Sequence, residues 1–257
     1  MAPRLELIGL SDLPEITPTS DLAGLIADAA ARDAGGLQPH DIVAVAQKVI
    51  SKVEDRFVTL ASVVPGPRAI RIAAQCDKDP RQVEVILSES KEVVRHRPGV
   101  LIVRHRLGHV LANAGIDASN VPRDGTGEER ILLLPLDPDA SARRLAEDLL
   151  QRTGVRPGIV INDSPGRAWR VGSVGIAIGV DGLPAVRDLR GRSDRDGREM
   201  QASDLATADE IAAAASIIMG QGAEGLPVVI VRGLGAFAEP SGNAGDLVRE
   251  AAMDLFR

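Results

Sequence analysis

Two short segments place a carboxylate where a loop begins. Asp117 follows the small apolar stretch of NAGIDASN, with Asn120 three residues further on, and Asp163 and Ser164 end the apolar run GIVINDS. Carboxylates in loops at strand ends are common oxygen ligands of Mg²⁺ or Mn²⁺, which keep bound water and accept phosphate oxygens as further ligands. Each aspartate alone has a second interpretation as a turn former or helix cap. Both interpretations stay open on the residues alone.

Basic side chains could complement these acids. Lys48 and Lys52 stand four residues apart at the end of an expected strand, and Arg167 and Arg170 flank Trp169, the one tryptophan of the chain. Arginine binds carboxylate or phosphate through two parallel hydrogen bonds, and tryptophan stacks on flat rings. These residues indicate an anionic partner. The alternative is a solvated edge on which Trp169 shields a core.

The segment GQGAEG, residues 220–225, has the spacing G-x-G-x-x-G. A dinucleotide-binding fingerprint requires a strand before it and a helix after it, whereas here an Ala-rich helical segment precedes it and a strand follows. We interpret it as a glycine-rich connection, or as a loop whose amides approach phosphate, with Gln221 and Glu224 as oxygen ligands. The reversed order of helix and strand argues against a Rossmann domain, and the sequence has no G-x-x-x-x-G-K-[ST] motif of a P-loop. We therefore expect neither a Rossmann domain nor a P-loop.

His105 and His109 have metal-ligand spacing but no H-E-x-x-H pattern. Because the chain has one cysteine and no matching acid, we expect no zinc site and interpret both histidines as surface side chains. Cys76 has no partner motif, so we expect it to be a small buried apolar residue.

Strand-like and helix-like segments, which must position these residues, alternate along the chain without a clean break between domains. The order mixes hairpins with helical crossovers, so we predict an α+β fold with mixed sheets rather than a doubly wound sheet. The expected strands cover 41–52, 99–105, 130–136, 158–163 and 227–233. The expected helices cover 22–32, 80–94, 138–153, 203–219 and 246–256. A hairpin is expected over 171–186 and a mobile loop over 187–200.

Composition bounds the class of protein. The chain has 257 residues, 44% hydrophobic and 26% charged, as in soluble globular proteins with ample material for a core. The net charge of −6 suggests no nucleic-acid partner, and one cysteine excludes an intrachain disulfide. The N-terminus lacks signal-peptide features and no apolar run approaches the ~18 residues of a membrane span. We expect a cytoplasmic protein without a membrane partner.

Seven motifs follow one another through nearly the whole chain: LPEI (13–16), QKVISK (47–52), NAGIDASN (113–120), LLLPLDPDASAR (132–143), NDSPGRAWR (162–170), VGIAIG (174–179) and MGQGAEGLPVVIVRG (219–233). Taken together, they resemble the coenzyme F420-0:L-glutamate ligases, or γ-glutamyl ligases. The resemblance implies one ligase domain over residues 1–257, for which two entwined α+β subdomains are one arrangement, and a homodimer. Some relatives carry a fused, flavin-binding, nitroreductase-like domain, so we expect a stand-alone ligase or the ligase domain of such a protein.

The resemblance also implies a reaction. Family members use GTP to add one or more L-glutamates, the later ones γ-linked, to the lactyl-phosphate carboxylate of F420-0. Mg²⁺ or Mn²⁺ would serve in a two-metal site, and K⁺ is a further candidate cation. Phosphorylation of the carboxylate gives an acyl phosphate that the amine attacks. Such a transfer needs charge neutralisation and alignment more than a protein nucleophile.

The matched motifs carry the family's roles onto individual positions of this chain. The implied metal ligands are Asp117, Asp163, Ser164 and Gln221. The implied catalytic residues are Asp117, Asp163, Lys52 and Arg167. The implied nucleotide contacts are Leu13, Pro14, Glu15, Ile16, Gln47, Lys48, Lys52, Asn120, Met219, Gly220, Gln221, Gly222, Ala223, Glu224, Gly225 and Leu226.

Two other functions stay open on the sequence alone. The acceptor pocket has no motif of its own, so another acyl-phosphate amide ligase with a different acceptor fits the same residues. A catalytically silent nucleotide-binding domain would bind GTP without metal-dependent turnover.

Overall fold

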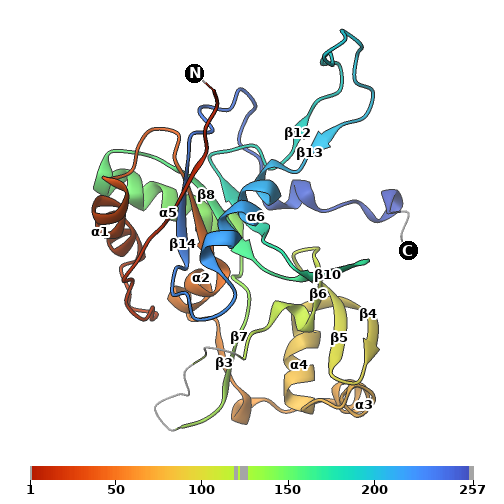
Figure 1. The fold of residues 1–257 in the computed structure, drawn as a ribbon. Coiled ribbons are helices and arrows are strands. Elements are labelled where there is room, and N and C mark those ends of the chain that lie inside the picture. The colour runs from red at the N-terminus through yellow and green to blue at the C-terminus, as the bar shows by residue number, and fades with distance from the viewer. Residues whose placement is uncertain (1, 119–120, 122–126, 255–257) are drawn as a thin grey trace. The chain divides into compact units, whose positions relative to one another are not determined.

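The chain divides into two compact units, and each is described by itself. The computed structural model describes residues 2–118, 121 and 127–254, with the side chain of Ala251 left aside. Unit 1 comprises Met1–Ile50, Leu136–Ser164 and Val174–Arg257, and unit 2 comprises Ser51–Pro135 and Pro165–Ser173. Each unit is therefore built from segments that are distant in the sequence (Figure 1).

Unit 1 contains a mixed five-stranded sheet. Its central pair, β2 and β8, is parallel, and every other pair of neighbours is antiparallel. The central strands are almost continuously apolar, as expected for strands that are buried on both faces. In spatial order the strands are β1 (Glu6–Gly9), β14 (Val228–Arg232), β2 (Ile42–Ala46), β8 (Gly158–Asp163) and β11 (Ile176–Asp181).

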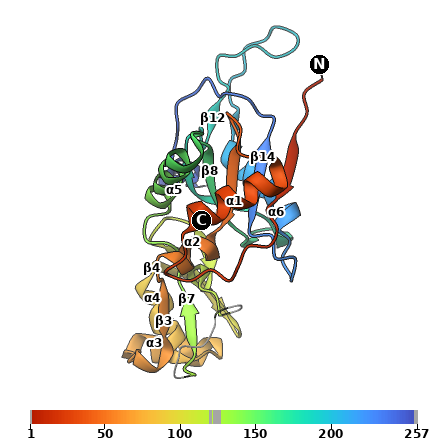
Figure 2. The same cartoon turned by 90° about the vertical axis from the view of Figure 1, so that its left-hand side faces the viewer.

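Helices cover both faces of this sheet. The Ala-rich helix α6 (Thr207–Met219) packs its buried residues on one face, against alternate residues of the strands such as Ala44 and Val229. Helices α1 (Leu22–Ala34) and α5 (Pro138–Thr153) pack side by side on the other face, which Figure 2 turns toward the viewer. Asp21 and Asp137 cap the two helices through their side chains, and a glycine in the left-handed conformation ends each.

The edge strand β11 is bound by side chains instead of a further strand. The carboxylate of Asp209 in α6 accepts a hydrogen bond from the Ala177 N–H at 2.8 Å, and that of Asp139 in α5 accepts from the Val180 N–H at 2.8 Å. These carboxylates occupy positions where an added strand would pair, which protects the edge from association.

Two further segments of unit 1 lie outside the sheet, one after β11 and one after β14. Residues 187–205 form a hairpin with β12 (Arg187–Asp188) and β13 (Asp204–Leu205) at its base, and backbone bonds such as Met200 N–H to Arg192 O join its arms. The predicted loop over 187–200 is thus a hairpin. The helix predicted over 246–256 is wrong for the described residues, which form two 3₁₀ turns, Ala244–Leu247 and Ala251–Met253.

Unit 2 is a smaller α+β arrangement. Helices α3 (Pro67–Cys76) and α4 (Pro80–Ser88) pack on a three-stranded antiparallel sheet and enclose a core that includes Ala73, Val83 and Leu101. The sheet consists of β4 (Ser90–Arg97), β5 (Val100–His105) and β6 (Val110–Ala112). Two separate two-stranded pairs are formed by β3 (Phe57–Thr59) with β7 (Arg130–Leu132) and by β9 (Gly166–Arg167) with β10 (Arg170–Ser173). The unit also contains the 3₁₀ turns Leu60–Ser62 and Asn113–Gly115.

The predicted α+β class with mixed sheets is confirmed, while several element limits are wrong. The strand expected over 41–52 ends at Ala46, where α2 (Gln47–Val53) begins, and the helix expected over 80–94 ends at Ser88. The hairpin expected over 171–186 does not form, because β11 pairs with β8 and β10 pairs with β9. Across the described ranges, no helix combines the length and the apolar composition required to span a membrane.

Candidate active site

Four of the singled-out segments meet at one edge of the five-stranded sheet. Strands β1, β2 and β8 end at this edge, and β14 and β11 begin there. The ladder fixes the alignment, because Ala46 pairs with Asn162 while its N–H donates to Pro227 O. The edge therefore receives residues 10–16 after β1, 47–48 after β2, 163–164 from β8 and 219–227 before β14. Polar residues beyond the carboxyl ends of adjacent parallel strands are a common arrangement of binding sites in open sheets.

Asp163 and Ser164 lie at the end of β8, both half-buried. The Asp163 carboxylate accepts a hydrogen bond from the Ser164 N–H at 2.8 Å, which fixes the turn. Gln221, 57 residues further along the chain, places its side-chain amide 3.0 Å from the Ser164 Oγ. The structure thus brings three of the four predicted metal ligands to one place. Their carboxylate, hydroxyl and amide groups supply the oxygen donors that Mg²⁺ and Mn²⁺ prefer.

The glycine-rich loop begins where α6 ends. Gly220 has φ +68° and ψ −173°, a conformation open essentially to glycine only, and a Cβ there would lie 2.1 Å from the Glu224 carboxyl carbon. The Glu224 carboxylate folds back and accepts a hydrogen bond from the Gly222 N–H at 2.7 Å. Residues 221–225 are exposed. The loop therefore presents backbone close to the Ser164–Gln221 pair, and Glu224 occupies one of its amides.

Two further nucleotide contacts are predicted on α2. Gln47, 3% exposed, begins this helix directly after β2, and Lys48 follows it half-buried. Lys52 is buried on the same helix one turn later, so the two lysines share a helix face rather than a strand end. The division between the units falls in this helix after Ile50, so Lys52 is counted with unit 2.

The segment Leu13–Ile16 continues from β1 at the same sheet edge without helix or strand structure. Ile16 is buried, Leu13 is half-buried, and Pro14 and Glu15 are exposed. This part of the predicted nucleotide site thus consists of a loop anchored by its apolar residues.

Asp117 is positioned within unit 2. It is half-buried and forms an antiparallel bridge with Leu132, in which Asp117 N–H donates to Leu132 O at 2.9 Å and Leu132 N–H donates to Asp117 O at 2.8 Å. Three consecutive residues before it, Asn113, Ala114 and Gly115, have φ of +52°, +57° and +67°. Left-handed conformations cost energy for residues other than glycine and concentrate at functional sites. Asn120, a predicted GTP contact, lies outside the described residues.

The GRAWR segment forms an exposed hairpin arm, residues 166–173, assigned to unit 2. Arg167 and Arg170 are direct cross-strand partners, and Trp169 at the turn has φ +65° and is 87% exposed. Trp169 therefore shields no core, which excludes that alternative. Two like charges placed opposite each other repel, so the arm is suited to an anionic partner.

The remaining candidates differ from expectation in one case. His105 is fully buried, so its interpretation as a surface residue is wrong, while His109 is half-buried. Burial, with a smaller electrostatic contribution from the neighbouring His105, lowers the pKa of His109 to about 4. Cys76 is buried, as predicted. Within the described part of the chain, no three His, Cys, Asp or Glu side chains form a metal-holding group.

Asn162 was missed as a candidate, although it stands beside Asp163 in the same motif. Its side chain is buried, its Nδ2 lies 3.3 Å from Met219 Sδ, and its Oδ1 has no hydrogen-bond partner in the described structure. Gly175 is required next to it, since a Cβ at Gly175 would lie 2.6 Å from Oδ1. Asn162 thus joins the end of β8 to the end of α6, where the glycine-rich loop starts.

The fold and site define an α+β protein whose polar loops gather at one sheet edge, and comparison with known proteins agrees with the motif resemblance. The family model described as F420-0:Gamma-glutamyl ligase matches residues 11–233. The chain therefore belongs to the F420-0:γ-glutamyl ligase family.

Several relatives match along nearly their full lengths. The protein named Coenzyme F420:L-glutamate ligase from Methanothermobacter thermautotrophicus is 39% identical over 254 residues, covering 98% of this chain and 99% of that one. The protein of the same name from Archaeoglobus fulgidus is 41% identical over 254 residues, covering 99% of this chain and 97% of that one. The protein of that name from Haloarcula marismortui is 39% identical over 259 residues, covering 98% of this chain and 96% of that one.

Proposed function

We propose that this protein is a GTP-dependent ligase that joins the amine of L-glutamate to the lactyl-phosphate carboxylate of coenzyme F420-0. One observation supports this most directly. The segments that carry the family's motifs in unit 1 converge on one sheet edge, where Asp163, Ser164 and Gln221 supply a compact set of oxygen donors. The names of the full-length relatives supply the substrate class.

The proposed reaction has two steps. A carboxylate oxygen of the acceptor attacks the γ-phosphorus of GTP, and GDP leaves. The glutamate nitrogen then attacks the acyl carbon, the amide bond forms, and inorganic phosphate leaves as the amine loses its proton. Addition of further glutamates repeats the sequence at a γ-carboxylate.

The residues of the chain would serve this reaction through charge and alignment. Lys48 and Lys52, one helical turn apart, would offset phosphate charge. The glycine-rich loop would let the nucleotide phosphates approach its backbone amides, provided that Glu224 is displaced from the Gly222 N–H. Arg167 would bind an anionic group of the substrates.

The donor chemistry fits a divalent cation. Asp163, Ser164 and Gln221 in unit 1 and Asp117 in unit 2 are proposed as ligands of Mg²⁺ or Mn²⁺, with two metals in total, and K⁺ is a further candidate. When bound, such ions neutralise developing charge on phosphate oxygens.

A mass-spectrometric assay tests the function. Purified protein is incubated with F420-0, L-glutamate, GTP and Mn²⁺, and parallel reactions omit GTP or Mn²⁺ or replace GTP with ATP. The proposal predicts products heavier by glutamyl units only with GTP and the metal. Replacing glutamate with hydroxylamine should yield the acceptor hydroxamate, which reports the acyl phosphate. No mass increase in the complete mixture would contradict the proposal.

A further inference from the structure

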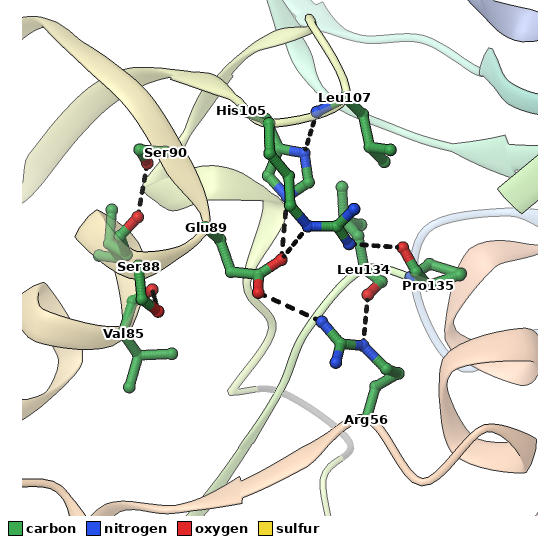
Figure 3. Close-up of polar contacts among 11 residues, drawn as sticks. Arg56, Val85, Ser88, Glu89, Ser90, His105, Leu107, Leu134 and Pro135 are labelled. Carbon is green, nitrogen blue, oxygen red and sulfur yellow. Dashed lines mark hydrogen bonds and ion pairs between the residues drawn. The ribbon is translucent and has the colours of Figure 1, made fainter. Parts of the chain in front are cut away.

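A buried carboxylate in unit 2 binds two arginines (Figure 3). The side chain of Glu89, which directly follows α4, is only 12% exposed. Its Oε2 accepts a hydrogen bond from Arg106 Nε at 2.9 Å, and its Oε1 accepts from a terminal nitrogen of Arg56 at 3.3 Å. His105 Nε2 lies 3.4 Å from Oε2 without hydrogen-bond geometry, while Nδ1 of the same ring accepts from Leu107 N–H. Glu89 thus gathers three nitrogen-bearing side chains around one carboxylate.

Glu89 is ionised in this environment. Burial opposes the charge, but the polar contacts from His105 and Arg106 and the positive charges of Arg106 and Arg56 outweigh it, so the pKa of Glu89 falls to about 2. A largely buried carboxylate that holds two guanidinium groups is costly to disrupt, because loss of its charge leaves two partly buried cations close together.

Both arginines also donate hydrogen bonds to carbonyls of the same short stretch of backbone. Arg56 Nε donates to the carbonyl of Leu134 at 2.9 Å, and Arg106 donates to the carbonyl of Pro135 at 2.9 Å. The main chain adds to this, because Leu133 N–H donates to Arg56 O at 3.0 Å. The segment 133–135 is therefore fixed by side chains whose orientation depends on Glu89.

This stretch in turn holds the turn that carries Asp117. Leu132, which directly precedes this stretch and pairs with Phe57 of β3, exchanges two backbone hydrogen bonds with Asp117. The buried side chain of Leu134 packs so closely on Gly115 that a Cβ at Gly115 would lie 3.0 Å from it. Two backbone bonds to Leu132 and the packing of Leu134 on Gly115 therefore tie the turn of Asp117 to residues 132–134.

We infer that Glu89 is a positioning residue for Asp117: through Arg56 and Arg106 it fixes residues 133–135, of which Leu134 packs on the Asp117 turn and Leu133 directly follows Leu132, the backbone partner of Asp117. This inference rests on the proposed function, in which Asp117 binds a divalent metal. Residues that orient a metal ligand without touching the metal typically change metal affinity ~10–100-fold when replaced.

The test compares Glu89→Gln with two controls. Glu89→Gln keeps the shape and removes the charge. Glu92→Gln removes another glutamate that is bonded to an arginine, Arg104 at 3.3 Å, but its side chain is 46% exposed. Val231→Ala truncates a fully buried residue of β14 in unit 1 and controls for loss of stability alone. All proteins are measured well below their unfolding temperatures.

Two measurements are made on each protein. Hydrogen exchange by mass spectrometry follows the amides of 113–117 and 130–135, and the signal of free Mn²⁺ in electron paramagnetic resonance gives Mn²⁺ affinity with GTP present. For Glu89→Gln we expect exchange at least about tenfold faster in both segments and Mn²⁺ affinity about tenfold weaker. Asp117→Ala gives the effect of losing the ligand itself. The two controls should keep wild-type values in both measurements.

Three results would overturn the inference: unchanged exchange in Glu89→Gln, an equal effect in Val231→Ala at matched stability, or Mn²⁺ affinity that Glu89→Gln leaves at the wild-type value. Failure of the proposed function is a separate result. It would show as absence of glutamyl transfer by the wild-type protein, while the exchange and Mn²⁺ comparisons still decide the role of Glu89.

Discussion

Asp163 and Ser164 show how a single strand end supplies the chemistry of the site. The last residue of β8 contributes a carboxylate, the next residue contributes a hydroxyl, and the hydrogen bond from the Ser164 N–H to the Asp163 carboxylate holds both in a fixed turn. Gln221 reaches the hydroxyl from the loop after α6. The sequence identified each of these residues, but only the ladder between β2 and β8 aligns Gln47 beside them.

Arg167 carries the first prediction at this scale. Arg167→Ala should lower kcat/KM for glutamyl transfer about tenfold or more, because a charge-assisted contact contributes roughly 1.5–3 kcal/mol. Steady-state kinetics with varied F420-0 and varied GTP would show which substrate it binds. Arg195→Ala, at an exposed arginine of the hairpin 187–205, is the control. Unchanged kinetics in Arg167→Ala would remove this residue from the site.

Glu89 carries a prediction about pH. Its pKa in the folded protein is about 2 against an ordinary value of 4.5, so the folded state favours the charged form and stability is fully present above pH 4.5. That stability, on the order of 3 kcal/mol, should be lost as the pH falls from 4.5 to 2. Urea unfolding across this range should show a smaller decrease in Glu89→Gln than in wild type. Equal pH dependence in both proteins would contradict the assigned ionisation.

At the scale of elements, local signals predicted the type of most long segments. Helix α5 follows from its Asp137-Pro138 start and its Gly154 end, and β8 follows from its apolar run. The failures have physical reasons. The Asp181-Gly182 turn was recognised, and Gly182 has φ +77°, but the partner of β11 is β8, which precedes the hairpin arm 166–173. Strand pairing across an inserted hairpin leaves no local pattern.

A weak local pattern also explains why α2 was predicted as part of a strand. Its run QKVISKV continues an apolar strand, and only the buried Val49 and Ile50, adjacent on one helix face with Val53, show the change from strand to helix periodicity. The convergence at the sheet edge was likewise not predicted, because it depends on strand order, which no single segment encodes.

The edge strand gives a prediction at this scale. The Asp139 carboxylate accepts hydrogen bonds from Val180 N–H and from Ala244 N–H, at 2.8 and 3.0 Å. Asp139→Ala leaves both donors unsatisfied, so the free energy of unfolding should fall by about 2–4 kcal/mol. Asp148→Ala, at an exposed position of the same helix, should change it by less than about 0.5 kcal/mol. Chemical denaturation measures both, and equal stabilities would show that the carboxylate does not protect β11.

At the scale of the whole molecule, the predicted homodimer remains to be tested. The arm 166–173 is exposed along its length, and it carries Trp169 and a fully exposed Val171 on an isolated two-stranded hairpin. Such a hairpin is marginally stable in water, and exposed apolar residues of this kind favour association. Light scattering after size exclusion should therefore give about twice the 27.0 kDa of one chain. A mass equal to one chain at micromolar concentration would contradict the dimer.

The assignment of the reaction to the sheet edge is tested most directly by one comparison. Wild-type protein and Asp163→Asn are incubated with F420-0, L-glutamate, GTP and Mn²⁺, and glutamyl products are quantified by mass spectrometry. Asp196→Asn, at the exposed tip of the hairpin 187–205, is the matched control. We predict glutamylated product with wild type and Asp196→Asn, and a rate lower by about 100-fold or more with Asp163→Asn. Wild-type rates with folded Asp163→Asn would contradict the location of the active site.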